Sequence, residues 1–225
     1  MLAKAHAALE DRLNTLYGKD GDTAPIASVS ATQSTSASPD EDQHARFGSS
    51  VKNWPIFPDS SQALHDLAKH YKLVILSNVD RASFAHTHAK LSTGDTDADA
   101  SPLYVSNPSE PYWFPQRTPG SKSPFSLILT AQDVNSYKPA PAGFLTALDV
   151  IQKDLLNGED PKPKVLWVAQ SLFHDIETAH RLGIRSTWIN RSGASMGSDE
   201  GNQKYTWKFS TLGEMAEAVS KDAQA

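Results

Sequence analysis

One stretch constrains the fold more than any other, KVLWVAQSLFHDIETAHRLGIRSTWINR at Lys164–Arg191. Its apolar run Val165–Ala169 is too short for a helix and contains β-branched and aromatic residues, which predicts a buried strand. Apolar residues then recur at helical spacing over residues 175–182, and Gly183 follows, where a left-handed residue commonly ends a helix. A second strand is predicted at Arg185–Ile189. A strand, a helix and a strand in this order form a βαβ unit, which implies a parallel sheet with covered faces.

The rest of the chain repeats this alternation of strands and helices. Apolar strands are predicted at Leu73–Leu76, Phe125–Leu129 and Trp207–Phe209, and amphipathic helical patterns lie between them. Such alternation is typical of the α/β class, with right-handed crossovers between parallel strands. We therefore expect residues 73–76, 125–129 and 165–168 to form parallel strands of one sheet.

Composition excludes several classes of protein. The chain has 225 residues, a formal net charge of −5 and no cysteine. A negative chain without a basic stripe argues against nucleic acid as the main partner. The absence of cysteine excludes a disulfide frame and a zinc–thiolate site. No apolar run reaches membrane-spanning length, and the N-terminus lacks a signal-type apolar core. We therefore expect a cytoplasmic protein that binds neither nucleic acid nor membrane.

The chain divides into two predicted parts, residues 1–60 and residues 61–225. The first part opens with an amphipathic helix over residues 2–16 that ends at Gly18. Residues 19–43 are rich in serine, threonine, alanine and aspartate, which predicts a disordered surface loop, and a further helical segment is predicted around residues 44–51. The second part is the predicted α/β core, with a serine- and proline-rich insertion at about residues 92–123.

Polar side chains follow three of the predicted strands. In parallel sheets, ligands bind at the carboxyl ends of the strands, so these side chains are the candidate site. They are Ser77 and Asn78 after the first strand, Tyr137 and Lys138 after the second, and Gln170, Ser171 and Asp175 after the third. The ammonium of Lys138 could hold a carboxylate or a substrate anion, and Asp175 would then pair with it. The plainer alternatives are helix capping by Ser77, Asn78 and Asp175, and a solvated loop lysine.

Metal and phosphate sites are not predicted. The four histidines His44, His86, His88 and His174 are not spaced as a metal set, and no glycine-rich phosphate loop or nucleophile elbow occurs. We therefore expect neither a metal nor a cofactor.

Three segments in this order resemble a known family. LVILSN at Leu73–Asn78, SYKPAPAGF at Ser136–Phe144 and VAQSLFHD at Val168–Asp175 resemble motifs two, three and four of the haloacid dehalogenase superfamily. FGSSVKNWPIFPDS before the first strand and TWINR at Thr187–Arg191 are similar to the type II 2-haloacid dehalogenase-like branch. The resemblance implies a Rossmann-type α/β core with a helical cap, of which residues 1–60 would be a part.

The resemblance also implies roles for the candidate residues. Ser77 and Asn78 would contact the substrate anion, Lys138 would steady a nucleophilic aspartate, and Asp175 would orient Lys138. Further substrate contacts would come from Tyr137, Gln170, Ser171 and Trp54. Members of the family hydrolyse carbon–halogen or phosphate-ester bonds through an aspartyl-enzyme intermediate.

Two departures from the family pattern affect the expected activity. No strand ending in the nucleophilic aspartate occurs upstream of Leu73, and Gln170 stands where phosphatase members usually have a magnesium-binding aspartate. We therefore expect a haloacid dehalogenase-like hydrolase family member, N-terminally shortened, in which hydrolysis of a small acid is in doubt. A sheet without that strand must close its gap or borrow a strand, so a homodimer is a possible assembly.

Three hypotheses about activity remain open. The chain could be a shortened form of a hydrolase. It could be a biosynthetic enzyme that reuses the cleft for a hydrophobic intermediate, with Trp54, Phe57, Tyr137 and His174 as linings and proton carriers. It could also be a non-catalytic protein that binds a small anionic molecule.

Overall fold

A computed structural model describes residues 4, 7–9, 11–12, 39–94, 110–192 and 203–224. The chain divides into two compact units, Met1–Trp54 and Pro55–Ala225. In the first unit, helix α2 (Pro39–Ser49) is followed by the short turn η1 (Ser50–Asn53). This helix begins earlier than we predicted, so the loop prediction is wrong for residues 39–43. Most of the predicted helix at residues 2–16 and the rest of the predicted loop lie outside the described residues.

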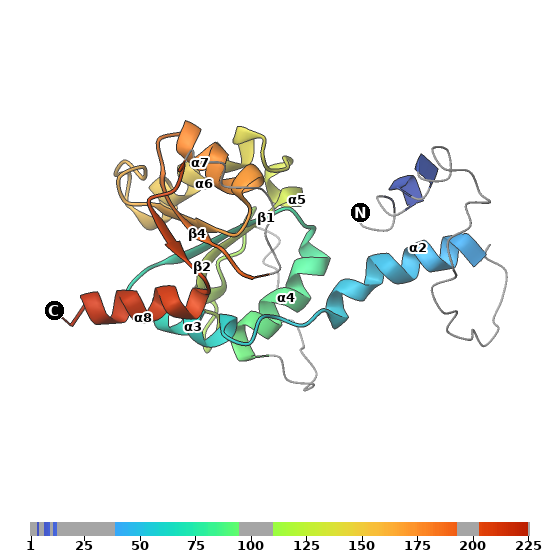
Figure 1. Cartoon of the computed structure of the whole chain (residues 1–225), viewed down its shortest axis with the longest axis horizontal. Helices are drawn as coiled ribbons and strands as arrows, with labels where there is room; N and C mark the ends of the chain where they lie inside the picture. The colour runs from blue at the N-terminus through green and yellow to red at the C-terminus, as the bar shows by residue number, and fades with distance from the viewer. Residues whose placement is uncertain are drawn as a thin grey trace. The chain divides into compact units, whose positions relative to one another are not determined.

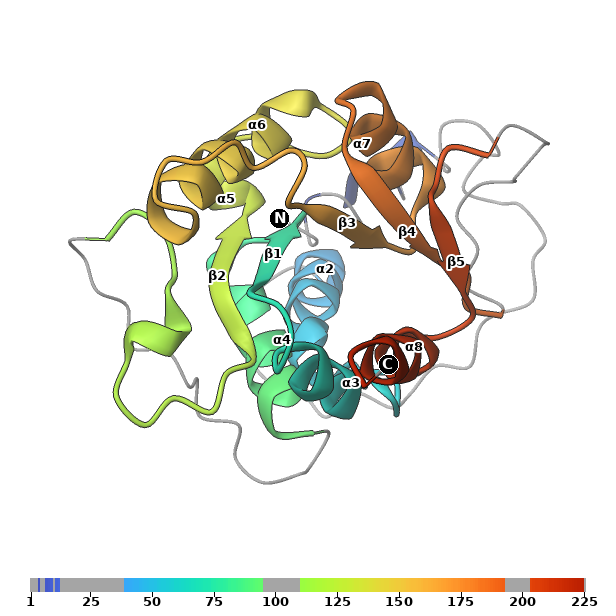
Figure 2. The ribbon, with the colours of Figure 1, turned by 90° about the vertical axis from the view of Figure 1, so that its left-hand side faces the viewer.

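The second unit has three layers, with parallel strands between two layers of helices (Figures 1 and 2). The strands are β1 (Leu73–Ser77), β2 (Phe125–Thr130), β3 (Leu166–Ala169), β4 (Arg185–Ile189) and β5 (Trp207–Phe209). The helices are α3 (Ser60–Leu67), α4 (Arg81–Thr93), α5 (Ala131–Val134), α6 (Pro141–Val150), α7 (Glu177–Arg181) and α8 (Leu212–Asp222). Three short helical turns complete it, η2 (Pro115–Arg117), η3 (Ile151–Leu155) and η4 (Leu172–Ile176).

The strands form two sheets. β1 pairs with β2 in one, and β3, β4 and β5 pair in that order in the other. All of these pairs are parallel, as predicted. The prediction of one sheet is wrong, because within the described residues no backbone pairing joins β1 to β3 (Figure 2). The described residues therefore do not close the expected gap by pairing β1 with β3, and borrowing of a strand stays a prediction.

Alternate side chains of β1 face the two helical layers. Leu76 packs with Phe144 and Leu148 of α6, on the layer that α6 and α7 form. Leu73 packs with Leu67 of α3 and with α8, on the opposite layer. Because both faces of the strand are covered, its sequence is a continuous apolar run rather than an alternating one.

The described end of the predicted insertion joins the core. Trp113 and Phe114 are buried, and the Trp113 backbone forms an antiparallel bridge with Ile128 of β2. Helix α4 extends to Thr93, and residues 95–109 lie outside the described part. Only a middle portion of residues 92–123 therefore remains as a candidate insertion.

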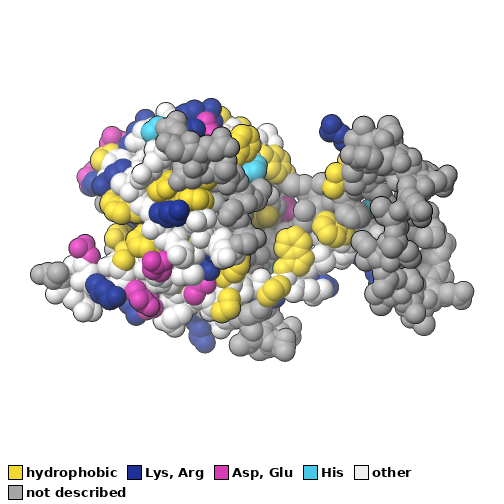
Figure 3. Space-filling model, viewed as in Figure 1, with side chains coloured by type: hydrophobic (Ala, Val, Ile, Leu, Met, Phe, Trp, Pro, Cys, Tyr) yellow, Lys and Arg dark blue, Asp and Glu magenta, His cyan; other side chains and the backbone are white. Residues whose placement is uncertain are grey.

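Charged side chains of both signs are interspersed over the second unit on the face seen in Figure 3. On this face, the described lysine and arginine side chains do not gather into a basic stripe. None of the helices in the described part of the chain is long and apolar enough to cross a membrane.

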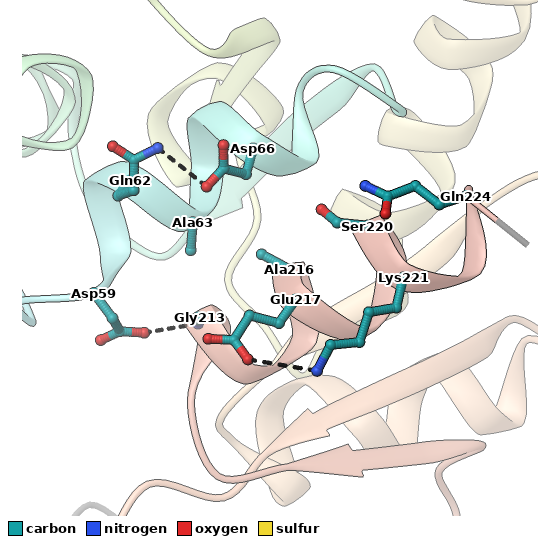
Figure 4. A pocket seen from close by; sticks show the side chains of 10 residues that line it. All are labelled: Asp59, Gln62, Ala63, Asp66, Gly213, Ala216, Glu217, Ser220, Lys221 and Gln224. Atoms are coloured by element: carbon teal, nitrogen blue, oxygen red, sulfur yellow. Dashed lines mark hydrogen bonds and ion pairs between the residues drawn. The ribbon is translucent and has the colours of Figure 1, made fainter.

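Asp59 connects three elements of the second unit. It stands at the N-cap of α3 but makes no side-chain cap bond there. Its carboxylate instead forms an ion pair with Arg191, at 2.8 Å from Nη1, and accepts a hydrogen bond from the backbone N–H of Gly213 at 2.9 Å. The Arg191 hydrogen bond lowers the pKa of Asp59 below its usual value. The start of α3, the end of β4 and the first turn of α8 are thereby tied together. Figure 4 shows the bond between Asp59 and Gly213.

Candidate functional site

The candidate site is built from the loops that follow β1, β2 and β3. Asn78, directly after β1, holds the backbone of Lys138 in the loop after β2. The Lys138 N–H donates to Asn78 Oδ1 at 2.8 Å, and Asn78 Nδ2 donates to the Lys138 carbonyl at 3.0 Å. Both ends of the Asn78 carboxamide are therefore used to position the lysine, a role that the sequence analysis did not foresee.

The Lys138 ammonium lies at the carboxyl end of β1. It donates to Asp175 Oδ1 at 2.8 Å and to the Leu76 carbonyl at 2.9 Å. The side chains of the ion pair are 14% and 9% exposed, respectively. An ammonium has three N–H donors, so these two contacts leave one donor for a further acceptor. The pairing removes the alternative that Lys138 is merely a solvated loop lysine.

Asp175 does not cap the helix of the βαβ unit. That role falls to Ser171, whose Oγ accepts from the backbone N–H of His174 at 3.0 Å. Asp175 lies in the π-helical turn η4, one turn further on, and is buried. Its Oδ1 also accepts from Trp167 Nε1 at 3.1 Å, and the Trp167 ring stacks on Phe144 with 4.2 Å between ring centroids. A packed indole therefore fixes the carboxylate that faces Lys138.

The other predicted site residues lie in different surroundings. Ser77 ends β1 and is partly buried. The Gln170 carbonyl accepts from Trp188 Nε1 at 3.0 Å, whereas its own Nε2 is buried with no partner among the described residues. Tyr137 is half exposed beside Lys138. Trp54 belongs to the first unit, where its indole donates to Ser50.

The start of α4 does not offer free backbone donors to an anion. Asp80 is the N-cap residue, and its carboxylate accepts from the backbone N–H of Ser83 at 2.8 Å and from the Ser83 hydroxyl at 3.0 Å. A carboxylate at this position would repel a second anion. The backbone N–H groups of Arg81 and Ser83 are thus already bonded, to Gln132 and Asp80, and a contact of Ser77 with an anion stays a prediction.

A groove of about 410 Å³ lies elsewhere, between α3 and α8. Asp59, Asp66, Glu217 and Lys221 are among its lining residues, and their interactions are drawn in Figure 4. None of the predicted site residues lines it. The groove is thus separate from the chemistry at Lys138.

The structure resembles solved dehalogenases. No protein-family model and no curated protein matches the sequence. An L-2-haloacid dehalogenase structure matches with a TM-score of 0.57 and 16% identity, over 97% of this chain and 73% of that one. The chain has the haloacid dehalogenase-like fold. A second dehalogenase structure matches with a TM-score of 0.55 and 20% identity, over 80% of this chain and 63% of that one.

A third solved structure is similar to this chain in the same way as the two dehalogenases. A haloacid dehalogenase-like family hydrolase from Xanthomonas campestris matches with a TM-score of 0.52 and 14% identity, over all of this chain and 75% of that one. The fold that the three sequence segments implied is therefore confirmed. At these identities the likeness concerns the fold alone.

The described residues of the haloacid dehalogenase-like core do not fit a magnesium ion. Mg²⁺ needs several oxygen ligands in octahedral geometry. Asp175 is the carboxylate at the site, and its Oδ1 already accepts from an ammonium and an indole. In the described part of the chain, no group of three His, Cys, Asp or Glu side chains could hold a metal ion.

Proposed function

We propose that this chain is a haloacid dehalogenase-like hydrolase family member that binds a small organic anion, a carboxylate or a phosphate, beside Lys138. The observation that carries the proposal is the ion pair of Lys138 with Asp175 at the carboxyl ends of β1 and β3. The contacts of the Lys138 ammonium with Asp175 and the Leu76 carbonyl use two of its three donors and leave one for a ligand oxygen. The Ser77 hydroxyl, at the end of β1, is a second candidate donor to the same anion.

The pair also limits the affinity. Because Asp175 neutralises the ammonium, the anion gains hydrogen bonds but no unopposed charge. We therefore expect a dissociation constant of about 1 mM, which corresponds to roughly −4 kcal/mol.

Hydrolysis is not expected from this chain alone. The aspartyl mechanism needs a carboxylate free to attack the substrate. Among the described residues, Asp175 is the acid that pairs with Lys138, and donors already hold its Oδ1. We propose that anion binding proceeds without release of halide or phosphate.

We also propose a cytoplasmic location, supported by the absence of cysteine, and a cap role for the first unit, supported by the motif resemblance.

Titration calorimetry with chloroacetate and with inorganic phosphate tests binding, and halide- and phosphate-release assays on the same preparation test turnover. We expect Lys138→Met to abolish the binding heat, since methionine keeps the chain length without the ammonium. Lys153→Met is the matched control, because Lys153 forms an exposed pair with Asp149. Release above background that requires both Lys138 and Asp175 would refute the absence of turnover. A wild-type titration without heat would refute anion binding.

A further inference from the structure

A serine and a histidine lie in contact shortly after the end of β3. Ser171 is the N-cap residue of η4, and its Oγ accepts from the backbone N–H of His174 at 3.0 Å. The same Oγ lies 3.0 Å from Nδ1 of the His174 imidazole. A helix cap needs only the first of these contacts. The second joins a hydroxyl to a base, which is the arrangement that activates a serine nucleophile.

The hydroxyl proton of Ser171 is directed to the imidazole. Ser171 is 7% exposed, and polar groups buried to this extent are normally hydrogen-bonded. Its oxygen already accepts a backbone N–H, and among the described residues the acceptor for its proton is His174 Nδ1. The neutral imidazole therefore carries its own proton on Nε2 and accepts at Nδ1. One lone pair of Oγ remains for attack on a carbonyl carbon.

Another cap in the same unit has this geometry with an acid in place of the histidine. The Thr130 hydroxyl donates to Asp133 Oδ2 at 2.8 Å, and the backbone N–H of Asp133 donates to Thr130 Oγ1 at 3.4 Å. Asp133 is ion-paired with Arg81, and Thr130 is fully buried. Ser171 differs in both respects, because its partner is an imidazole, the side chain best suited to proton transfer near neutral pH, and because part of it reaches the surface.

The turn η4 holds the serine in place. The backbone N–H groups of Asp175 and Ile176 both donate to the Ser171 carbonyl at 3.2 Å. Asp175 is itself fixed, since its Oδ1 accepts from the Lys138 ammonium and the Trp167 indole. A nucleophile and a base that are held in contact before the substrate arrives react faster than mobile groups do.

An exposed aromatic ring lies beside the histidine. Phe173 is 58% exposed, and its ring packs edge-on against the His174 imidazole with 5.1 Å between ring centroids. It offers an apolar surface next to the base, which suits an apolar acyl group. We propose that Ser171 is a nucleophile that accepts an acyl group from carboxylic esters with an apolar acyl chain, with His174 as its general base.

The proposed step transfers the acyl group from the ester oxygen to the serine oxygen. Oγ of Ser171 bonds to the carbonyl carbon while His174 Nδ1 takes the hydroxyl proton. The bond from this carbon to the alcohol oxygen then breaks, and His174 gives the proton to the departing oxygen. The products are an acyl-serine and an alcohol, so atoms, protons and charge balance without a further reactant. The step depends neither on an aspartyl nucleophile nor on anion binding at Lys138.

The full chain with p-nitrophenyl butyrate tests the proposal. We expect a burst of about one equivalent of p-nitrophenolate per chain and a butyryl adduct that peptide mass mapping places on Ser171. Ser171→Asn keeps a cap acceptor without the hydroxyl, so it should fold but lose both the burst and the adduct. His174→Gln keeps a hydrogen-bonding side chain that is not a base, so its burst should be at least about tenfold slower.

Ser83→Ala is the matched control, because the Ser83 hydroxyl donates to the carboxylate of Asp80 rather than to an imidazole. Its burst should equal that of the wild type, and melting temperatures of all variants separate a lost reaction from a lost fold. Three outcomes would overturn the proposal: no adduct on Ser171 in the wild type, a burst that persists in Ser171→Asn, and equally fast labelling of Ser171 in His174→Gln. The first would leave Ser171 as a helix cap alone, and it decides the question even where a variant does not fold.

Discussion

Acid should destabilise this protein through His88. The His88 side chain is fully buried, and its Nε2 lies 2.7 Å from the hydroxyl of Ser123. Its Nδ1 is buried with no hydrogen-bond partner among the described residues, and the ring lies against the rings of Trp113 and Phe125. Burial away from water lowers the pKa of His88 from 6.5 to about 4, so the folded protein keeps this imidazole neutral.

The size of this loss of stability follows from the difference in the pKa of His88 between the folded and the unfolded protein. The unfolded chain binds a proton at His88 below pH 6.5, whereas the folded protein does so only below about pH 4. Stability therefore falls as the pH decreases between these values. The full loss is about 3 kcal/mol, and about 2 kcal/mol of it has occurred by pH 5. For a chain of this size, 2 kcal/mol corresponds to a fall in melting temperature of about 4–8 °C.

Thermal unfolding at pH 7 and at pH 5 measures the effect, with His88→Gln as the test variant. Glutamine can still bond Ser123 but does not titrate, so its melting temperature should fall less between the two pH values than that of the wild type. His70→Gln, at an exposed position, is the control and should behave as the wild type. Equal falls in the wild type and in His88→Gln would refute the assignment of the acid sensitivity to this histidine.

Three further predictions concern stability. Lys138→Ala should lower the free energy of unfolding by about 3–5 kcal/mol, because it leaves the largely buried Asp175 unpaired, and urea titration should show no comparable loss for Lys153→Ala. Asp59→Ala should cost about 2–3 kcal/mol at pH 7. Because the pKa of Asp59 is lowered, the difference in free energy of unfolding between the wild type and Asp59→Ala should shrink as the pH falls below 3.8. A difference between their urea midpoints that stays the same at low pH would contradict this prediction. Gly183→Ala should cost about 1 kcal/mol through its positive φ of 71° alone, since an added Cβ meets no atom within 4 Å, and calorimetry should show no change in the fold.

The elements that the sequence predicted well are those with a local signal. The strands at residues 73–76 and 125–129 were predictable because short apolar runs stop at polar residues. The positive φ of Gly183 was predictable too, because a glycine directly after a helical pattern commonly takes the left-handed conformation that ends the helix. Helix α5 was missed although its signal is local, a capping box between Thr130 and Asp133.

The division into two sheets could not be predicted from such signals. Strand pairing joins residues far apart in the sequence, and the apolar runs of β1 and β3 do not specify which strand lies beside them. At the site, helix capping was the plainer alternative for Asp175, whereas the cap is Ser171, which the sequence analysis did not consider for that role. Asp175 is held instead by contacts with residues distant in the sequence or the fold, since its Oδ1 accepts from the Lys138 ammonium and the Trp167 indole.

The Asn78 carboxamide connects the end of β1 to the loop that carries Lys138. By bonding both the N–H and the carbonyl of Lys138, it makes the lysine backbone follow the end of β1 rather than its own loop. The Lys138 ammonium is also held at this strand end, because it donates to the Leu76 carbonyl of β1. The end of β1 therefore holds Lys138 at two points, the backbone through Asn78 and the ammonium through the Leu76 carbonyl, so Asn78→Ala would free the lysine backbone while the ammonium keeps its bond to β1.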